Sequence, residues 1–276
     1  MHPIEFQAHE IEDRGVYVIK NVTSMPRYGE AYISKNLVIA VNHQGVAEVE
    51  YDMKPAVFTC HDVSVIHPNH ALMCKSTSPD YNATLLVISG RRFDELNSRL
   101  ASYGRSVYHS SPAFHVEDSE YEMVCRTIDV IESVTLSDLS SKSSILIKAI
   151  EMLSQMFNDM RGSVDTKKVN GTTIFNRFYQ LLAEHYKESR EVCFYAEKLC
   201  LSPKYFGTLI RKEVGVTANR CIANYVVLQA KDLLATRRDL TIQQVSSMMG
   251  FPDQATFSRY FKTEAGISPV QYRVTR

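Results

Sequence analysis

Short apolar runs alternate with turn-forming residues over the first 90 positions of the chain. β-Branched residues are concentrated in four of these runs, at 16–20, 37–52, 62–68 and 83–89, and Pro, Gly, Asn and Asp stand between them. Runs of this kind are typical of strands joined by tight turns. In the second run Val46, Val49 and Tyr51 are interleaved with acidic residues, so we expect a strand with one solvated face. The pattern predicts a small antiparallel barrel or sandwich.

A helical period replaces this alternation after residue 90. Apolar residues recur every three or four positions in three segments, 91–104, 118–133 and 143–160, which predicts three amphipathic helices. The stripe of the third helix holds Leu146, Ile150, Leu153 and Phe157. We expect the second and third helices either to close the mouth of the barrel or to form a dimer interface. The stretch 161–171 is polar and contains two glycines, so it is predicted to be a linker.

The patterns therefore divide the 276 residues into two domains. Residues 1–160 form a β-rich domain with helices, and residues 172–276 form a helical domain. The helical domain contains an internal repeat, because 202–221 and 253–272 align without a gap at an offset of 51. Each copy has the pattern of a helix, a tight turn and a second helix, which predicts two helix-turn-helix units at about 194–214 and 243–264.

The second helix of each unit has two different faces. We expect Phe206, Leu209 and Ile210 to be buried in the first copy, and Phe257, Tyr260 and Phe261 in the second. The opposite faces carry Lys204, Gly207, Thr208 and Arg211 in one copy and Gln254, Ala255, Ser258, Arg259 and Lys262 in the other. Such side chains suit the base edges and phosphates of a major groove. Because the face occurs twice, we interpret it as a DNA-binding surface rather than an ordinary solvated face.

A long helix is predicted between the two units, over 218–240. Its apolar face holds Ile222, Val226, Ala230 and Leu233, and Arg237 and Arg238 lie near its C-terminal end, where cations are favoured. A rigid helix would fix the distance between the two units. Major grooves recur about every 34 Å on one face of a duplex, so the pair is expected to enter two successive grooves.

Charge supports this division. The chain has 31 basic and 31 acidic residues, but residues 171–276 contain 15 Lys and Arg against 9 Asp and Glu. The helical domain therefore carries a net charge of +6 and the rest of the chain −6, which favours a polyanionic partner for the helical domain.

Other chemistry is weakly represented in the sequence. The cysteines, Cys60, Cys74, Cys125, Cys193, Cys200 and Cys221, form no C-x-x-C pair and are expected to be reduced thiols. His67 and His70 are the nearest candidate for a metal site, whereas His43 and His61 are scattered and no H-x-H pair occurs. We therefore expect no metal, no cofactor and no enzymatic activity, and a metal-dependent cupin enzyme is the remote alternative.

Location follows from what the sequence lacks. No apolar run approaches the roughly 20 residues of a membrane helix. The segment 1–15 is polar and acidic, with neither the basic start nor the apolar core of a signal peptide. We expect a cytoplasmic protein with no membrane partner.

Residues 174–273 resemble the AraC/XylS family of bacterial transcription regulators. GFPDQATFSRYFKTEAGISPVQYR (250–273) resembles the family signature around the second helix-turn-helix, and AEKLCLSPKYFGTLIRKEVG (196–215) resembles the first. AKDLL (230–234) stands where the connecting helix of the family has a similar motif. The N-terminal half is similar in layout to the family's cupin-like effector-binding barrel and dimerisation helices. The expected fold class is therefore α+β, with a cupin-like antiparallel β-barrel and flanking helices followed by an all-α domain.

The resemblance implies roles for individual residues. Base contacts would fall on Lys204, Gly207, Thr208, Gln254, Ala255 and Arg259. Contacts to the DNA backbone would fall on Tyr205, Arg211, Lys212, Thr256, Ser258 and Lys262. Gly207 and Ala255 have no side-chain donor, so direct readout is expected to rest mainly on the other four base-contact residues. Val226 stands where the connecting helix commonly has an Arg, so any anchoring by that Arg is missing.

The resemblance also implies a dimeric, sequence-specific regulator that binds double-stranded DNA and activates transcription by contact with RNA polymerase; repression stays open. A small-molecule effector would bind in the barrel. Tyr17, Tyr28, Tyr32, Met53 and His67 are pocket candidates, but each is expected to be plain core or surface, so no ligand-binding residue is assigned. The alternative is an effector-independent regulator whose N-terminal half only dimerises or contacts another protein.

Overall fold

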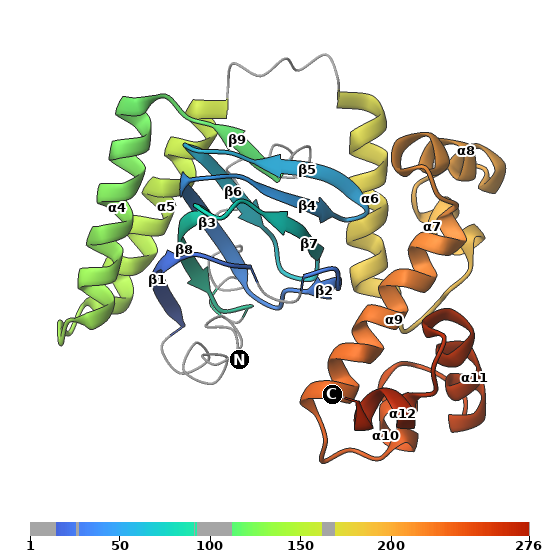
Figure 1. Ribbon diagram of the computed structural model, residues 1–276. Coiled ribbons are helices and arrows are strands. Elements are labelled where there is room, and N and C mark those ends of the chain that lie inside the picture. The colour runs from blue at the N-terminus through green and yellow to red at the C-terminus, as the bar shows by residue number, and fades with distance from the viewer. Residues whose placement is uncertain (1–14, 26–27, 91, 93–111, 162–168, 276) are drawn as a thin grey trace. The chain divides into compact units, whose positions relative to one another are not determined.

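The computed structural model describes residues 15–25, 28–90, 92, 112–161 and 169–275, which Figure 1 draws in colour. The chain divides into two compact units, Met1–Lys167 and Lys168–Arg276. The helix predicted at 91–104 lies outside the described residues, apart from residue 92. Among the helices that are described, none combines the length and the hydropathy that crossing a bilayer requires.

The first unit is built on two antiparallel sheets. Its described strands are β1 (Val16–Val22), β2 (Tyr32–Ile33), β3 (Leu37–Gln44), β4 (Ala47–Tyr51), β5 (Lys54–Phe58), β6 (Asp62–Ile66), β7 (Ala71–Thr77), β8 (Asn82–Ile88) and β9 (Ala113–His115). The order is β1-β8-β3-β6-β9 in the larger sheet and β2-β7-β4-β5 in the smaller one. These sheets, followed by the helices of the second unit, confirm the predicted α+β class with an N-terminal cupin-like antiparallel β domain.

The predicted strand at 37–52 is in fact two strands that belong to different sheets. The chain turns between β3 and β4 at Gly45, where φ is +75°. A Cβ at this position would lie 2.4 Å from Ser78 Oγ and 2.7 Å from Tyr81 Cα, so the turn requires glycine. This close contact with a distant segment ends the first strand.

The alternation expected after this turn is wrong at two positions, Val46 and Asp52, because Asp52 was expected on the solvated face but is buried. Ala47, Val49 and Tyr51 are buried, whereas Val46 is 39% exposed because it belongs to the turn. Strands β2, β5, β7 and β9 lie outside the predicted runs. β5 contains Pro55, which has no backbone N–H to donate. Proline is tolerated here because β5 lies at the edge of the smaller sheet.

Helices α4 (Asp118–Leu136) and α5 (Lys142–Arg161) cover one face of the larger sheet (Figure 1). They extend the two predicted helices by a few residues. Of the predicted apolar stripes, Tyr121 at the start of α4 is only partly buried. The other members are all buried, namely Val124, Ile128, Ile131, Leu146, Ile150, Leu153 and Phe157. These side chains share one cluster with Val41, Val63 and Leu86 of the sheet. The stripes therefore cover the sheet, and a dimer contact would have to use the opposite faces of the helices.

The other face of the larger sheet contributes to a second core shared with the smaller sheet. Ile66 and Ala83 belong to this cluster, together with Val49 and Phe58 of the smaller sheet. Neighbouring residues of a strand point to opposite faces. Asn42 and Ser64 follow Val41 and Val63 and therefore point into this interior, away from the helices.

The second unit consists of helices. They are α6 (Val169–His185), α7 (Val192–Lys198), α8 (Pro203–Val214), α9 (Ala218–Thr236), α10 (Ile242–Met248), α11 (Gln254–Ala265) and α12 (Pro269–Val274). α6 starts inside the predicted linker and includes its last three residues. α9 contacts α8 as well as α10, α11 and α12, and Figure 1 shows it running from one helix-turn-helix to the other.

The connecting helix ends earlier than the predicted residue 240. It stops at Thr236, after which Arg237 leaves the helical conformation and its guanidinium donates to the Asp239 carboxylate at 2.9 and 2.8 Å. The 19 residues of α9 span about 28 Å at the usual rise of an α-helix.

Candidate nucleic-acid interface

The two copies of the repeat fold with the same start and stop signals. Ser202 Oγ accepts from the backbone N–H of Tyr205 at 3.3 Å at the start of α8, and Asp253 accepts from that of Thr256 at 2.7 Å at the start of α11. Both helices end at a glycine with positive φ, Gly215 (+76°) and Gly266 (+80°). The sequence repeat is therefore a structural repeat of capped helices of equal length, 12 residues each.

Each of these two helices, α8 and α11, buries one face against the rest of the helical domain. Phe206, Ile210, Phe257 and Phe261 are fully buried, as predicted, whereas Leu209 and Tyr260 are only partly buried at the edge of that face. Ala196 and Ser246, small residues on the first helix of each helix-turn-helix, are also fully buried, which lets the two helices of each motif approach closely.

The opposite faces contain the residues that the sequence predicts to contact DNA. Exposed on α8 are Lys204, Tyr205, Thr208, Arg211 and Lys212, and exposed on α11 are Gln254, Ala255, Thr256, Arg259 and Lys262. Gly207 and Ser258 are partly exposed between them. The structure thus brings each predicted set together on one helix, on the side away from the buried aromatic residues.

The cations on these two faces differ from other arginines of the unit. Arg220 pairs with Glu264 at 2.9 Å, Arg237 with Asp239 at 2.8 Å, and Arg273 donates to the Leu240 carbonyl at 2.7 Å. With the residues that the structure describes, Lys204, Arg211, Lys212, Arg259 and Lys262 form no ion pair. Their charges remain available to an external anion such as a phosphate.

Two hydroxyl groups of the faces are already engaged. Thr208 Oγ1 donates to the Lys204 carbonyl at 3.0 Å, and Thr256 Oγ1 donates to Asp253 Oδ2 at 3.0 Å. Each hydroxyl therefore offers an acceptor to a partner rather than a donor. Hydrogen bonds from Thr256 hold the pKa of the Asp253 carboxyl below its ordinary value, so the cap remains ionised at neutral pH.

Two further positions have defined roles in this unit. Val226 is buried in the core on α9, so this position supplies packing. Arg190, in the loop before α7, donates to the Met249 carbonyl at 2.5 Å in the second copy. No sequence pattern indicated Arg190, because its contact depends on two segments that are far apart along the chain.

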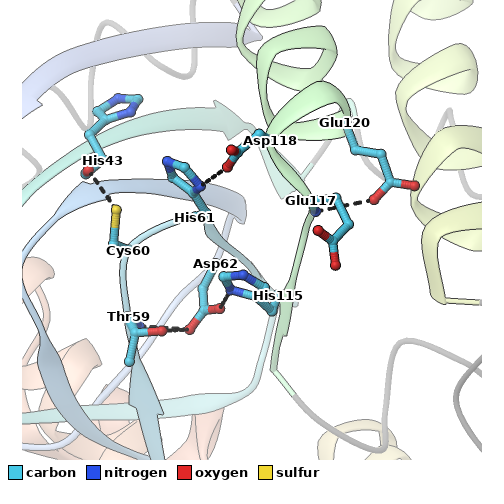
Figure 2. A network of polar contacts seen from close by, with 9 residues as sticks. All are labelled: His43, Thr59, Cys60, His61, Asp62, His115, Glu117, Asp118 and Glu120. Carbon is cyan, nitrogen blue, oxygen red and sulfur yellow. Dashed lines mark hydrogen bonds and ion pairs between the residues drawn. The ribbon is translucent and has the colours of Figure 1, made fainter.

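A polar network in the first unit brings together histidines that are scattered in the sequence. The His61 and Tyr121 rings stack at 4.1 Å, and His43 Nδ1 lies 2.5 Å from Tyr121 Oη. Figure 2 shows the ion pairs of His61 with Asp118 and of His115 with Asp62. Burial lowers the pKa of His43. The network joins the start of α4 to the larger sheet.

Neither this network nor the candidate pair His67 and His70 belongs to a group of three or more described side chains that could hold a metal ion. His70 Nδ1 lies 2.5 Å from Asp52 Oδ2, and both side chains are buried, so His70 is part of the core. Within the described residues, no group of three or more His, Cys, Asp or Glu side chains is arranged to hold a metal ion.

Residues 195–275 match the family model described as "Helix-turn-helix domain". The arabinose operon regulatory protein of Escherichia coli (strain K12) is 35% identical over 95 residues, which are 34% of this chain and 32% of that protein. The raffinose operon transcriptional regulatory protein RafR of Pediococcus pentosaceus is 30% identical over 106 residues, 38% of each chain. The match thus spans about a third of the length of these curated relatives.

Two solved structures are also similar. The C-terminal domain of AraT, a response regulator from Geobacillus stearothermophilus, is 30% identical with a TM-score of 0.35 and covers 37% of this chain and 85% of that chain. ToxT from Vibrio cholerae O395 is 13% identical with a TM-score of 0.46 and covers 94% and 96% of the two chains.

Proposed function

We propose that this chain, whose C-terminal unit belongs to the AraC/XylS family of transcription regulators, binds specific DNA sequences and regulates transcription by placing α8 and α11 in two successive major grooves. The observation that carries the proposal is the duplicated helix with a buried aromatic face and an exposed face of unpaired cations. A tandem surface of this kind suits a polyanion with a repeating groove.

Base readout is proposed for the residues near the middle and N-terminal part of each exposed face. Arg259 suits guanine and Gln254 suits adenine, because each presents two hydrogen-bonding groups side by side. Thr208, as an acceptor, suits an exocyclic amino group, and Lys204 suits an acceptor such as guanine O6. Ala255 can contact a thymine methyl group, and Gly207 permits close approach of the helix.

Phosphate contacts are proposed for the residues that flank these positions. They are Tyr205, Arg211, Lys212, Thr256, Ser258 and Lys262. Contacts to phosphates fix the register of the helix on the duplex and dominate the salt dependence of binding. In bacteria the chromosomal DNA lies in the cytoplasm, so we propose that location for a chain that is similar to bacterial regulators.

A selection from random DNA tests the proposal. The purified full-length chain is incubated with a library of random duplexes, and bound duplexes are amplified and sequenced. We expect an enriched motif with two boxes whose centres are about one helical turn, 10–10.5 base pairs, apart. Enrichment of a single box would contradict the use of two grooves, and no enrichment would contradict sequence-specific binding.

Control by a small-molecule effector in the first unit is supported by the interior between the sheets. Asn42 Nδ2 and Ser64 Oγ are fully buried there and have no hydrogen-bond partner among the residues that the structure describes. Buried polar groups without partners are uncommon in folded proteins, and a ligand with an acceptor group would satisfy Asn42. A first unit that only dimerises is the alternative, and calorimetric titration with candidate metabolites distinguishes the two.

Homodimerisation and contact with RNA polymerase complete the proposal. Met123 and Val130 on α4 and Met152 on α5 are large apolar side chains that remain exposed, and they suit an interface with a second copy. The effector would favour one arrangement of the dimer over another and so change transcription. We propose activation through RNA polymerase and no enzymatic step.

A further inference from the structure

The loop between α6 and α7 contacts the turn of the second helix-turn-helix. Gly250 in that turn has a φ of +71°, and a Cβ on it would lie 2.1 Å from the Lys187 carbonyl oxygen. Only glycine permits backbone segments to approach this closely. The entrance to the first helix-turn-helix is therefore packed directly on the turn of the second.

Arg190 fastens this contact. Its Nη2 donates to the Met249 carbonyl at 2.5 Å, and its guanidinium lies 3.7 Å from the centre of the Phe251 ring. An arginine can make both contacts at once because its planar group stacks on an aromatic face while its edge donates hydrogen bonds. A lysine offers no planar group to stack.

The contact extends to α11 on one side and to α7 on the other. The Phe251 ring lies 5.3 Å from the rings of Phe257 and Tyr260 in α11. On the other side, the Tyr195 hydroxyl in α7 donates to the Ser189 carbonyl at 2.8 Å, next to Arg190. Arg190 thus joins the loop before α7 to the turn that precedes α11.

The first copy shows that the turn can form without contacts like those of Gly250 with Lys187 and of Arg190 with Met249. Cys200 stands at the position that corresponds to Gly250, also with positive φ (+56°), and its side chain is exposed. The turn of the first copy therefore forms with a larger residue. We therefore interpret the Arg190 contacts as fixing the position of one copy relative to the other, rather than as a requirement for the fold of either copy.

We propose that Arg190 is a positioning residue that fixes the orientation of α11 relative to α8 and thereby the spacing between the two DNA boxes that the chain accepts. The inference rests on the proposed function. α9 is one connection between the two helix-turn-helix motifs, and two motifs held by a single connection can rotate about it as a hinge. The contact of Arg190 with Met249 and Phe251 is a second connection, away from α9, and it restricts this rotation. The Arg220–Glu264 pair adds only an exposed ion pair, which contributes little rigidity.

The test uses the two-box duplexes enriched by the full-length chain, with one or two base pairs inserted or deleted between the boxes. Binding of the wild type, Arg190→Ala and Arg190→Lys is measured by fluorescence anisotropy. Arg177→Ala is the matched control, since Arg177 is an exposed arginine on α6. Duplexes with a single box serve as the second reference.

The wild type should lose affinity by about 30-fold or more for a two-base-pair insertion, because the second box rotates away from a fixed α11. In Arg190→Ala and Arg190→Lys this penalty should fall below about 5-fold, while affinity for a single box changes by less than about 2-fold. Arg177→Ala should behave as the wild type. An Arg190→Ala protein that retains the full spacing penalty would overturn the proposal.

A measurement without DNA separates this inference from the proposed function. Hydrogen exchange followed by mass spectrometry should show faster exchange over 249–257 in Arg190→Ala, with 203–214 unchanged. Equal acceleration in both segments would mean general destabilisation and would refute a role confined to positioning. If the full chain enriches no duplex at all, the proposed function fails, whereas the exchange experiment still decides whether Arg190 orders the second copy.

Discussion

The side chains that face solvent on α8 and α11 follow directly from helical spacing. Once Phe206 and Phe257 are taken as buried, the period of 3.6 places Lys204 and Arg259 on the opposite faces, and the caps Ser202 and Asp253 fix where each helix starts. The chemistry of single residues therefore determines which positions can meet DNA.

Arg259→Ala is expected to weaken binding to the specific duplex by about 1–3 kcal/mol while leaving non-specific binding largely intact. The reason is that a base-reading arginine discriminates among sequences, whereas the charges that remain on both helices still attract any duplex. Anisotropy titrations against the selected duplex and a scrambled one measure the difference. Lys262→Ala, on the same helix, is the matched control: it should weaken both duplexes alike and lower the salt slope by about one. Equal losses on both duplexes for Arg259→Ala would assign Arg259 to the phosphates instead.

Backbone conformation at the two turns was beyond reach of the sequence alone. Cys200 has positive φ without being glycine, and the need for Gly250 comes from the Lys187 carbonyl, which lies in the distant loop between α6 and α7. Periodicity describes what a helix buries, but it carries no information on which distant backbone atom approaches a turn. For the same reason Arg190 gave no signal, although Lys204 and Arg259 did.

Gly250→Ala is expected to destabilise the second unit by at least about 2 kcal/mol, because it combines positive φ with a steric clash. Cys200→Gly should change stability by less than about 1 kcal/mol, since relief of positive φ is offset by the greater entropy of the unfolded chain. Urea unfolding followed by circular dichroism compares the two. Similar losses in both variants would show that Gly250 has no special contact.

At the level of elements, α4 and α5 were predicted better than the strands, whereas α6 was not predicted. The stripes of α4 and α5 are long and regular, so their existence and buried faces could be predicted. The strand run at 37–52 gave no sign that Gly45 divides it between two sheets, because the reason lies in Ser78 and Tyr81 across the fold. Short strands such as β9 have too few residues to show a period.

The junction between α4 and the larger sheet is expected to weaken at acidic pH. Burial depresses the pKa of His43 below 6.5, its ordinary value, so the folded state binds fewer protons than the unfolded state as pH falls below about 6.5. The contribution of neutral His43 to the stability of the first unit is therefore fully present above about pH 6.5 and decreases as the pH falls below it. Nearby Asp129 opposes this depression and His61 reinforces it.

Thermal unfolding of the full chain between pH 7.5 and 5.5 tests this expectation. The melting temperature of the first unit should fall with pH in the wild type and fall less in His43→Gln, which keeps a neutral hydrogen-bonding side chain. His115→Gln is the control, because the His115 side chain is 62% exposed. An identical pH profile for His43→Gln and wild type would contradict a contribution from His43.

For the whole molecule, the change in the spacing of apolar residues along the chain predicts the division into a β unit and a helical unit. The same spacing does not predict which surface would bind a second copy of the chain. The buried stripes of α4 and α5 turned out to cover the sheet, which leaves only the outer faces for a second copy. Composition alone could not distinguish these two uses, because an apolar stripe has the same pattern whether it meets a sheet or another chain.

The double variant Val130→Asp/Met152→Asp is expected to convert a dimer into a monomer without unfolding it, because both side chains lie exposed on the outer faces of the helices. Sedimentation velocity at micromolar concentration provides the measurement. Val57→Asp is the matched control, since Val57 is a similarly exposed valine on the smaller sheet. A double variant that still sediments as the wild type does would exclude this surface as the interface.

Hydroxyl-radical footprinting of the full-length chain on a duplex enriched from the random library tests the central claim most directly. Two helices in successive grooves should protect two patches of backbone on one face of the duplex, with centres about one helical turn apart. Protection of a single patch, or of two patches on opposite faces, would contradict the account.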